Sequence, residues 1–462
     1  MMDARTRMLL EAPVGQTIVR LAMPNVVVMV IQSAIGLLET YFVAKLGVDA
    51  LTAMALVFPP FMLLIMVSAG AMGGGILSAI ARALGAGNTK LANESVWSAF
   101  VITVALGAAV TVAALQWGPS LYALMGGRDQ SLALASTYSA IVFAGAIPLW
   151  LFNSMAAMIR ATGNMILPAS VISAGALFLV PVSPLLIFGL GPLPRLGIAG
   201  GGVAVLIYYV VGCGVFAWYL WSGRGVLRPS VKPPRLRWAP MKEILRVGLA
   251  SSVVSLSTNV TAMVATGLAG LVGTAAVAGY GTGVRLEYLL VPLVFGLGQP
   301  VGAMVGTAIG AGKPERAMRA AWTGAAIAGG LTEAIGLAAA IWPQAWLSLF
   351  GGDAQMLAYG ASYLRIVGPA YGLFGAGLAL YFASQGAGKL GWPVTAAVAR
   401  VVIAAGGGWL ALKLTGSSAG LFAGLAVALF VFGVINAVAI VAGGWSPRRH
   451  AAPRQRALLS LP

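Results

Sequence analysis

The chain alternates long apolar stretches with short polar or glycine-rich turns. Twelve stretches are long enough for a helix to cross the bilayer core, which takes about 20 residues. They lie near 19–44, 51–80, 92–117, 132–160, 165–189, 198–221, 242–269, 275–308, 318–342, 356–384, 391–413 and 418–442. Helices are expected because backbone groups in lipid must pair within their own segment, and the sequence lacks the short alternating segments of a membrane barrel. The pattern predicts an all-α membrane protein with twelve transmembrane helices.

The second half of the chain repeats the first at a common offset of 225 residues. The matches are Gly85-Ala86-Gly87-Asn88 with Gly310-Ala311-Gly312-Lys313, Gly126-Gly127 with Gly351-Gly352, Tyr138 with Tyr363, Gly163-Asn164 with Gly388-Lys389, and Pro168 with Pro393. Each half holds six spans, so both halves enter the membrane in the same orientation, as in transporters whose parallel repeats are related by a pseudo-twofold axis. We expect a six-helix lobe over 1–222 and another over 242–445.

Charged residues are scarce and unevenly placed. They make up 8% of the chain against 60% hydrophobic residues, whereas soluble domains carry roughly 25% charged residues, so a large soluble enzyme is excluded. Lys and Arg number 28 against 11 Asp and Glu. On the twelve-span topology 21 of these 28 lie on one side, four lie on the other, and Arg285, Arg365 and Arg400 fall inside spans. By the positive-inside rule, both termini of this multi-pass plasma-membrane protein are cytoplasmic.

The net charge of +17 is therefore explained by membrane orientation and indicates no nucleic-acid partner. Two basic segments lie outside the lobes. The first, 223–241, is expected to be a cytoplasmic linker that lies against anionic lipid headgroups, and the second, 446–462, is a basic cytoplasmic tail.

Three acidic residues lie well inside the predicted spans, and ionisable groups in a bilayer mark functional sites by default. In the first span Asn25, Gln32 and Glu39 are spaced by seven residues, so they form one polar stripe on the helix. Pro24 at the base of the stripe permits a kink. The stripe is expected to face the interior of the lobe, because facing lipid would be prohibitive.

A solitary carboxylate in apolar surroundings favours its protonated form, since burial penalises the charge. Such a group can load and release a proton as access alternates. Glu39 is therefore the first choice for a proton-coupling carboxylate, and the alternative is a hydrogen-bonded packing residue.

The other two intramembrane acids, Glu287 and Glu333, are secondary candidates for ion coupling. Arg285 points to the opposite face of its helix from Glu287, so these two should not pair. An interhelical ion pair with Arg365 or Arg400 is expected for the acids, and that role is structural. Arg285, Arg365 and Arg400 are all candidates for structural ion pairs.

Five polar residues inside spans are candidates for lining a substrate cavity. They are Asn25, Gln32, Asn153, Asn259 and Gln299. For the last three, hydrogen bonds between helices are an equally good interpretation.

Motifs that look enzymatic lack the residues that their chemistry needs. Gly416–Gly420 matches the nucleophile-elbow pattern, but that pattern requires a strand and a histidine base, and the only histidine is His450 in the basic tail. The Gly-Lys pairs at 312–313 and 388–389 lack the other residues of a phosphate loop. The single Cys213 excludes an intrachain disulfide. We expect no enzyme activity, no metal site and no organic cofactor.

Several stretches resemble the multidrug and toxic compound extrusion (MATE) family, most closely its prokaryotic DinF-like branch. They are Leu21–Pro24 followed by Glu39–Gly47, Arg82–Asn88, Arg160–Pro168, Val305–Ala317, and Tyr363–Arg365 with Phe382–Pro393. They are spread over nearly the whole chain. The resemblance implies twelve helices in two lobes and export of cationic or amphiphilic compounds, driven by inward proton or sodium flow.

The chain departs from the family at the site that the resemblance implies. Family members usually carry an aspartate at the end of the first helix, where this chain has Glu39. The DinF-like cation site also uses an Asn-x-x-x-Asp pair in the fifth helix, which aligns with Leu179 and Ser183, and a threonine in the sixth, which aligns with Val205. Most oxygen ligands of that site are therefore missing.

These departures favour proton over sodium coupling, because sodium needs several oxygen ligands and a proton needs one carboxylate. They also leave open a relocated site near Glu287 or Glu333. The acid that some members carry in the seventh helix has no obvious counterpart among Ser255, Ser257 and Asn259.

The sequence thus predicts a secondary efflux antiporter that acts as a single chain and exchanges small amphiphilic or cationic compounds for protons by alternating access between two lobes. The alternative is a lipid-linked oligosaccharide or polysaccharide flippase of the same superfamily, although such flippases often carry fourteen spans and a cationic cavity. An integral membrane enzyme is opposed by the lack of a buried catalytic set. A channel is less favoured because of the duplication and Glu39.

Overall fold

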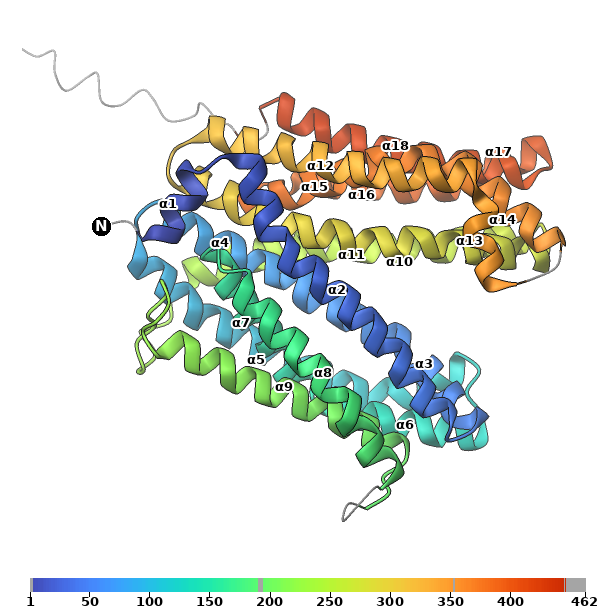
Figure 1. The fold of residues 1–462 in the computed structure, drawn as a ribbon, viewed down its shortest axis with the longest axis horizontal. Coiled ribbons are helices and arrows are strands. Elements are labelled where there is room, and N and C mark those ends of the chain that lie inside the picture. The colour runs from blue at the N-terminus through green and yellow to red at the C-terminus, as the bar shows by residue number, and fades with distance from the viewer. Residues whose placement is uncertain (1–2, 190–193, 352–353, 444, 446–462) are drawn as a thin grey trace, which may run out of the picture.

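The computed structural model describes residues 3–189, 194–351, 354–443 and 445, and the basic tail 446–462 with His450 lies outside them. Within the described residues eleven helices are long and apolar enough to cross a membrane, and α6 and α7, which meet at a bend of 45°, supply a twelfth span when taken together. This all-helical arrangement (Figure 1) confirms the predicted fold class.

The N-terminal lobe begins with a short helix that the hydrophobic pattern did not predict. Its elements are α1 (Ala4–Glu11), α2 (Val14–Ala44), α3 (Val48–Ile65), the π-helical segment η1 (Met66–Met72), α4 (Gly73–Gly85), α5 (Thr89–Leu124), α6 (Asp129–Ala144), α7 (Ala146–Ala161), α8 (Ile166–Phe188) and α9 (Ile198–Trp221). The Asp3 side chain caps α1 by accepting from the Arg5 N–H at 2.9 Å. Arg316 of the other lobe donates to the Leu9 and Ala12 carbonyls at the end of α1.

The C-terminal lobe has the same order of spans. Its elements are α10 (Trp238–Gly270), α11 (Thr274–Gly310), α12 (Pro314–Ile341), α13 (Pro343–Leu347), η2 (Ser348–Phe350), α14 (Ala354–Val367), η3 (Gly368–Ala370), α15 (Tyr371–Ala387), α16 (Gly391–Val402), η4 (Ile403–Gly407), α17 (Gly408–Thr415) and α18 (Ser418–Val441). The structure begins α10 at Trp238, inside the predicted linker 223–241, because the helix extends beyond its long apolar segment through Lys242, Glu243 and Arg246.

The turns of the two lobes share their backbone geometry, which supports the repeat. Gly87 and Gly312 have φ angles of 70° and 69°, and Gly163 and Gly388 have φ angles of 81° and 71°. This left-handed conformation ends a helix and favours glycine, because a side chain would be strained there. Each pair is separated by 225 residues, so the repeat reflects equivalent helix ends.

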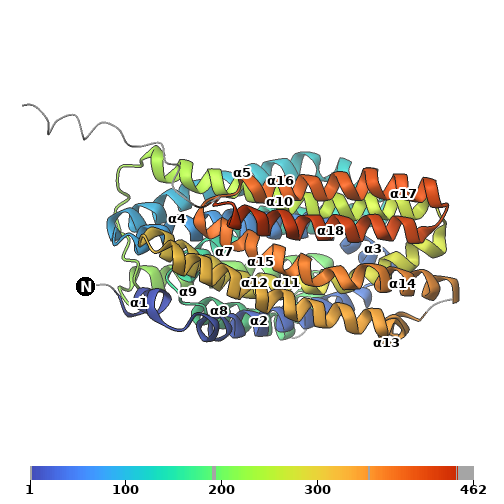
Figure 2. The same ribbon diagram turned by 90° about the horizontal axis from the view of Figure 1, so that it is seen from above.

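The two ends of the molecule differ. We call the end that carries α1, the linker and the α4–α5 and α11–α12 turns the basic end, and the opposite end the open end. The lobes lie against each other at the basic end and diverge toward the open end (Figure 1). In the view turned by 90° the spans of both lobes run roughly along one direction (Figure 2). The contacts between the lobes include those of α4 with α10 and α11, and those of η1 with α10.

Candidate functional site

Glu39 of α2 lies toward the open end, and its half-buried carboxylate points into the N-terminal lobe. It lies near Ser183 of α8 and Tyr138 of α6. The Ser183 hydroxyl is buried and has no hydrogen-bond partner among the described residues. A Cβ at Gly201 of α9 would lie 3.8 Å from Glu39 Oε2, so the glycine leaves room beside the carboxylate. No described Lys or Arg forms an ion pair with Glu39.

The predicted polar stripe on α2 does not face one interior, and this expectation was wrong. Asn25 is buried between the lobes and its Nδ2 donates to the Gly296 carbonyl of α11 at 3.3 Å. Gln32 is exposed, and only Glu39 points into its own lobe. The reason is that α2 packs against α11 near the basic end and against α8 and α9 of its own lobe, so neighbours differ along its length. The helix continues through Pro24, and a kink there stays a prediction.

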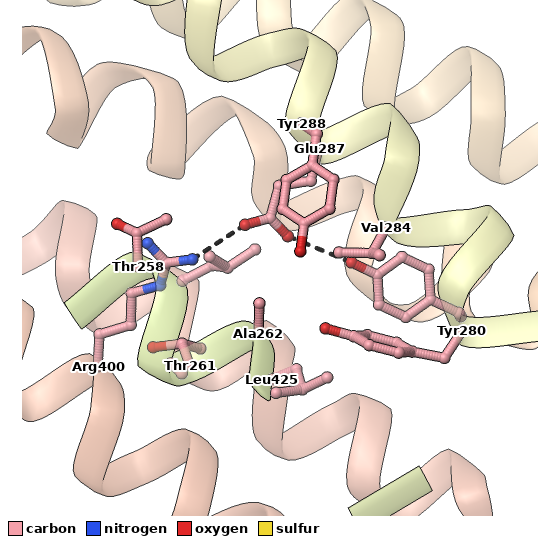
Figure 3. A pocket seen from close by; sticks show the side chains of 12 residues that line it. Thr258, Thr261, Ala262, Tyr280, Val284, Glu287, Tyr288, Arg400 and Leu425 are labelled. Carbon is pink, nitrogen blue, oxygen red and sulfur yellow. Dashed lines mark hydrogen bonds and ion pairs between the residues drawn. The ribbon is translucent and has the colours of Figure 1, made fainter. Parts of the chain in front are cut away.

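Glu287 of α11 and Arg400 of α16 form a buried ion pair in the C-terminal lobe (Figure 3). Arg400 Nη2 lies 2.9 Å from Glu287 Oε1, and the Tyr363 hydroxyl donates to Oε2 at 3.2 Å. The guanidinium also lies 4.8 Å from the ring centroid of Phe374. Removing one partner of a buried pair costs about 3–5 kcal/mol, because the other charge is left uncompensated. Arg400 is one of the two partners expected for the acids, and the structural role of the pair stays a prediction.

The surroundings of this pair combine tyrosine and threonine side chains with aliphatic ones, and the tyrosines and threonines supply the polar groups. They come from α10, α11 and α14 and include Thr258, Thr261, Tyr280, Tyr288 and Tyr363. Arg400 Nε and the Tyr371 hydroxyl of α15 are buried without a hydrogen-bond partner in the described part of the chain.

The other two intramembrane arginines form no ion pair within the described residues, contrary to expectation. Both are exposed, and the Arg285 guanidinium lies 5.0 Å from the ring centroid of Phe350. Arg285 and Glu287 do lie on opposite helix faces as predicted, since one is exposed and the other buried. Arg365 points away from the lobe interior that holds both acids.

Glu333 of α12 does not pair with an arginine, so this expectation was also wrong. Its Oε2 accepts the Gly372 N–H at 2.7 Å, and the neighbouring Thr332 hydroxyl donates to the Tyr371 carbonyl at 2.9 Å. The helix that contains these backbone groups is interrupted by η3, which carries Pro369. Pro interrupts a helix because it lacks an N–H and its ring clashes with the preceding turn. Glu333 therefore satisfies backbone groups at a helix break.

The three remaining amide candidates lie in different environments. Asn153 of α7 donates to the Ser68 hydroxyl at 2.8 Å inside the N-terminal lobe. Asn259 of α10 is exposed and donates across the lobes to Met66 Sδ at 3.8 Å. Gln299 of α11 is buried, and its Oε1 has no hydrogen-bond partner in the portion that the structure describes. These positions agree with helix contacts for Asn153 and with the lobe interface for Asn259.

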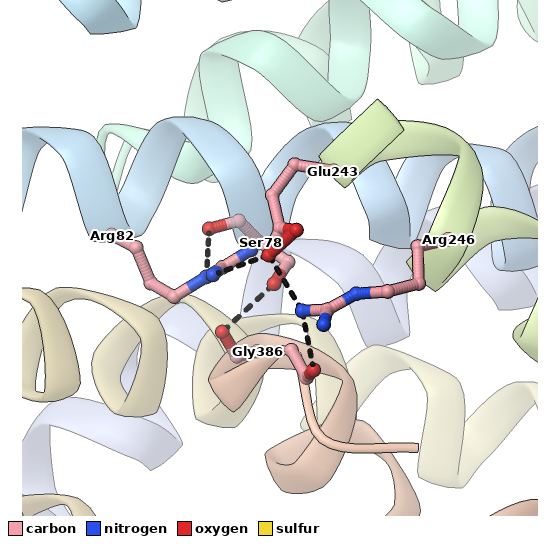
Figure 4. Close-up of polar contacts among 6 residues, drawn as sticks. Ser78, Arg82, Glu243, Arg246 and Gly386 are labelled. Atoms are coloured by element: carbon pink, nitrogen blue, oxygen red, sulfur yellow. Dashed lines mark hydrogen bonds and ion pairs between the residues drawn. The ribbon is translucent and has the colours of Figure 1, made fainter. Parts of the chain in front are cut away.

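Charged side chains join the lobes at the basic end (Figure 4). Glu243 Oε1 of α10 lies 3.0 Å from Arg82 Nη1 of α4 and 2.6 Å from Arg246 Nη2 of its own helix. The Ser78 hydroxyl of α4 donates to the Gly386 carbonyl of α15 at 2.9 Å. We call Ser78, Arg82, Glu243, Arg246 and Gly386 the basic-end cluster. It holds α4 of one lobe to α10 and α15 of the other.

Backbone segments also approach closely here. A side chain at Gly85 would clash with the Thr307 carbonyl, and one at Gly310 would clash with the Arg82 carbonyl. Gly85 and Gly310 are equivalent in the repeat, so the lobes meet through a symmetric pair of glycine contacts. Gln385 adds hydrogen bonds to the Gly70 carbonyl at 3.1 Å and to the Ser251 hydroxyl at 2.7 Å.

The family model that matches this chain is MatE, over residues 24–185 and 250–410. One matched segment lies in each lobe. Among curated relatives, a FAD transporter of Shewanella oneidensis is 27% identical over 370 residues, which cover 79% of this chain and 81% of the relative. The probable multidrug resistance protein NorM of Thermotoga maritima is 23% identical over 360 residues, which cover 78% and 77% of the two chains. The multidrug export protein MepA of Staphylococcus aureus is 26% identical over 290 residues, or 62% and 63%.

Solved structures show the same two-lobe fold. A multidrug resistance MATE family transporter in an outward-facing conformation matches with a TM-score of 0.86 at 24% identity, over 96% of this chain and 99% of that one. A MOP superfamily transporter from Pyrococcus furiosus, described as having a binding pocket of reverse polarity, matches with a TM-score of 0.85 at 23% identity, over 95% and 97% of the chains. These likenesses confirm the predicted two-lobe membrane fold.

Proposed function

The chain belongs to the MatE family of membrane transporters, and from this premise we propose that it exports small amphiphilic or cationic compounds in exchange for protons. It acts as a single chain in the plasma membrane, with the basic end in the cytoplasm, as the positive-inside rule indicates. The relatives named for multidrug export support this substrate class.

The observation that carries the proposal is the state of Glu39. Its carboxylate is half-buried beside a serine hydroxyl and a tyrosine, and no described cation neutralises it. Burial without a counter-ion penalises the charged form, so proton binding relieves the penalty. Glu287, by contrast, is neutralised by Arg400 at 2.9 Å. Glu39 is therefore the coupling carboxylate of the proposed mechanism.

The proposed cycle uses the difference between the two ends. With the basic end cytoplasmic, the structure is an outward-facing state, because the lobes meet at the basic end and diverge at the other (Figure 1). An external proton binds Glu39 in this state and the exported compound leaves. The lobes then rock, the basic-end cluster separates, and the proton is released toward the cytoplasm, as alternating access between parallel repeats requires.

Proton coupling is favoured over sodium by the side chains around Glu39. The positions that would add oxygen ligands from α8 and α9 are Leu179 and Val205, which are apolar, and Ser183 supplies one hydroxyl. A hard cation binds best to several oxygen ligands. A proton needs only the carboxylate.

A second candidate substrate is an anionic aromatic compound such as a flavin nucleotide. The relative named as a FAD transporter supports it. So does Arg400, a cation surrounded by tyrosines of α11 and α14. Displacement of Glu287 from Arg400 by an anionic group would be the recognition step.

The test is transport in everted vesicles, with pH and sodium gradients imposed separately. Ethidium serves as the cationic amphiphile and FAD as the anionic aromatic compound. We expect ethidium accumulation to follow the pH gradient in the wild type and to be lost in Glu39→Gln. Glu39→Asp, which keeps the carboxylate, should retain it.

A response to sodium but not to pH would contradict proton coupling. Movement of FAD but not of ethidium would favour the second candidate. Unchanged proton-driven transport in Glu39→Gln would exclude Glu39 as the coupling group.

A further inference from the structure

An apolar groove of about 840 Å³ lies on the surface of the N-terminal lobe, away from the basic-end cluster and from Glu39. Ligand sites in proteins typically measure about 300–1,000 Å³. Helix α7 packs against both α5 and α9, so its side chains form the floor, and α5 and α9 form the walls. The lining is Trp97, Phe100, Val101, Val104 and Ala105 of α5, Leu151 and Met155 of α7, and Cys213, Gly214, Ala217 and Trp221 of α9.

Small residues keep the groove open. Ala105 stands on one wall, and Gly214 and Ala217 stand on the other. A Cβ at Gly214 would meet no atom within 4 Å, so the space in front of this glycine is unoccupied by protein. Larger side chains at these positions would fill the groove without displacing backbone.

The length of the groove matches one leaflet. From Trp97 to Ala105 the wall rises by eight residues, or about 12 Å at 1.5 Å per residue. Half of the hydrocarbon core of a bilayer is about 15 Å. A lipid chain that enters at the Trp97 end would therefore reach almost to the bilayer midplane along this groove.

Aromatic rings mark the mouth of the groove at the basic end. Trp221 lies 5.9 Å from Trp97 and 5.6 Å from Phe100 between ring centroids, so α5 and α9 are bridged there. Both indole N–H groups point to the Ser230 carbonyl, at 3.1 Å from Trp97 and 3.5 Å from Trp221. Tryptophans are enriched at the level of lipid headgroups, because their rings are amphipathic.

The linker brings cations to the same mouth. Besides the two indole contacts at Ser230, the Arg228 N–H donates to Asn93 Oδ1 of α5 at 2.9 Å, so the linker is fixed by the helices that form the groove. The Arg224 guanidinium lies 4.7 Å from the ring centroid of Trp218 on α9. Five exposed cations follow one another along the linker: Arg224, Arg228, Lys232, Arg235 and Arg237. Only Arg237 has an acidic partner among the described residues, Glu94 at 3.8 Å.

We propose that this groove binds an acyl chain of an anionic phospholipid from the leaflet at the basic end, and that the linker cations hold its phosphate headgroup. The apolar walls fit the chain, the tryptophans lie at the headgroup level, and the charge at the mouth is complementary to phosphate. A polybasic segment gains about 1 kcal/mol per Lys or Arg near an anionic surface, which is about fivefold in binding per charge. The bound lipid would thereby hold in place the linker that joins the two lobes.

Native mass spectrometry of the full-length transporter in mild detergent tests the proposal. The probes are phosphatidylglycerol and phosphatidylcholine with identical acyl chains, supplied in equal amounts. We expect the wild type to retain phosphatidylglycerol in preference to phosphatidylcholine. Gly214→Leu should reduce phosphatidylglycerol retention by about tenfold, the effect of excluding two methylene groups from the groove.

Ala105→Leu fills the same groove from the opposite wall, so a folding defect in one variant would not decide the outcome. Gly330→Leu is the matched control, because its Cβ also meets open space, but on α12, away from the groove. Arg228→Gln combined with Lys232→Gln should lower the preference for phosphatidylglycerol and leave phosphatidylcholine retention unchanged.

Wild-type retention of phosphatidylglycerol in both groove-filling variants would overturn the proposed chain site. Equal retention of the two lipids by the wild type would overturn the anionic headgroup site. If Gly330→Leu reduced phosphatidylglycerol retention as much as Gly214→Leu, the proposal would also be contradicted, since the effect would then be independent of the groove.

Discussion

Glu39 in the N-terminal lobe and Glu287 in the C-terminal lobe are in opposite electrostatic states. Glu39 in the N-terminal lobe lies beside hydroxyl groups and has no counter-ion among the described residues. Glu287 in the C-terminal lobe is paired with Arg400 at 2.9 Å and accepts a hydrogen bond from Tyr363. The two lobes therefore share an architecture but hold these acids at positions that are not equivalent and in different electrostatic surroundings.

This difference in ion pairing indicates which of the two carboxylates can titrate during a transport cycle. Protonating an ion-paired carboxylate leaves the charge of its partner uncompensated in a medium of low dielectric constant, which costs free energy. Protonating an unpaired one removes a buried charge, which is favourable. The comparison predicts that transport depends on Glu39 and that stability depends on Glu287.

The largest expected effect is the loss of proton-driven transport in Glu39→Gln. Glutamine keeps the size and hydrogen-bonding capacity of the side chain but cannot carry the charge. We expect accumulation of ethidium in everted vesicles under a pH gradient to fall to the level of vesicles without the transporter. Expression and thermal midpoint should match the wild type, which distinguishes a coupling defect from misfolding.

The second effect concerns the C-terminal lobe. Arg400→Met leaves Glu287 buried without its partner, and we expect a loss of about 3–5 kcal/mol in stability. Thermal unfolding of the purified protein measures it as a lowered midpoint. Glu287→Gln combined with Arg400→Met removes both charges and should recover most of the midpoint. If Arg400→Met alone were as stable as the wild type, the Glu287–Arg400 pair would have no structural role.

A smaller effect is expected at the basic-end cluster. Glu243→Gln weakens the contact between Arg82 and α10, and because these side chains are partly exposed the loss is about 1 kcal/mol. The equilibrium should shift toward states in which the open end has closed. Spin labels at Asp49→Cys and Gln344→Cys, in a Cys213→Ser background, allow the distance between the two lobes to be measured by electron–electron resonance. The labelled protein with Glu243→Gln should show a larger population of short distances than the labelled protein without it. An unchanged distribution would mean that this cluster does not bias the conformation.

The smallest effect is expected for Glu333→Gln. The amide oxygen can still accept the Gly372 N–H, so stability should fall by less than about 1 kcal/mol. Proton-driven transport should be retained, since Glu333 supports a helix break. Loss of transport in this variant, with an unchanged thermal midpoint, would move the coupling role away from Glu39.

The spans and the repeat could be predicted from sequence because both depend on local properties. A run of apolar residues specifies a membrane helix by itself, and a glycine such as Gly87 or Gly312 ends a helix through its own backbone conformation. The Glu287–Arg400 pair could also be anticipated, because a buried charge needs a partner and few were available.

The errors concern contacts that depend on how helices from distant parts of the chain meet. The spacing of Asn25, Gln32 and Glu39 places them on one helix face, but the angle between the lobes decides which neighbour covers each one. Glu333 was assigned an arginine partner because the break at Pro369, which creates free backbone groups opposite it, lies on another helix.

The residues that sequence reasoning missed lie mostly at the contact between the lobes. Arg82 and Glu243 are 161 residues apart, one just beyond the span predicted at 51–80 and the other at the start of the span predicted at 242–269, so nothing in the hydrophobic pattern joins them. Gln385 lies in the stretch Phe382–Pro393, which carries the family resemblance but does not indicate a contact between the lobes. The repeat was the available signal: Gly85 and Gly310 are equivalent positions, and both lie where the lobes touch.

The most direct test of the central claim is infrared difference spectroscopy of the purified transporter between acid and alkaline pH. The comparison uses the wild type, Glu39→Gln, and the neutral-pair variant Glu287→Gln with Arg400→Met. The account predicts a carboxyl band that titrates in the wild type and in the neutral-pair variant and is absent from Glu39→Gln. A band that persists in Glu39→Gln and disappears only in the neutral-pair variant would contradict it.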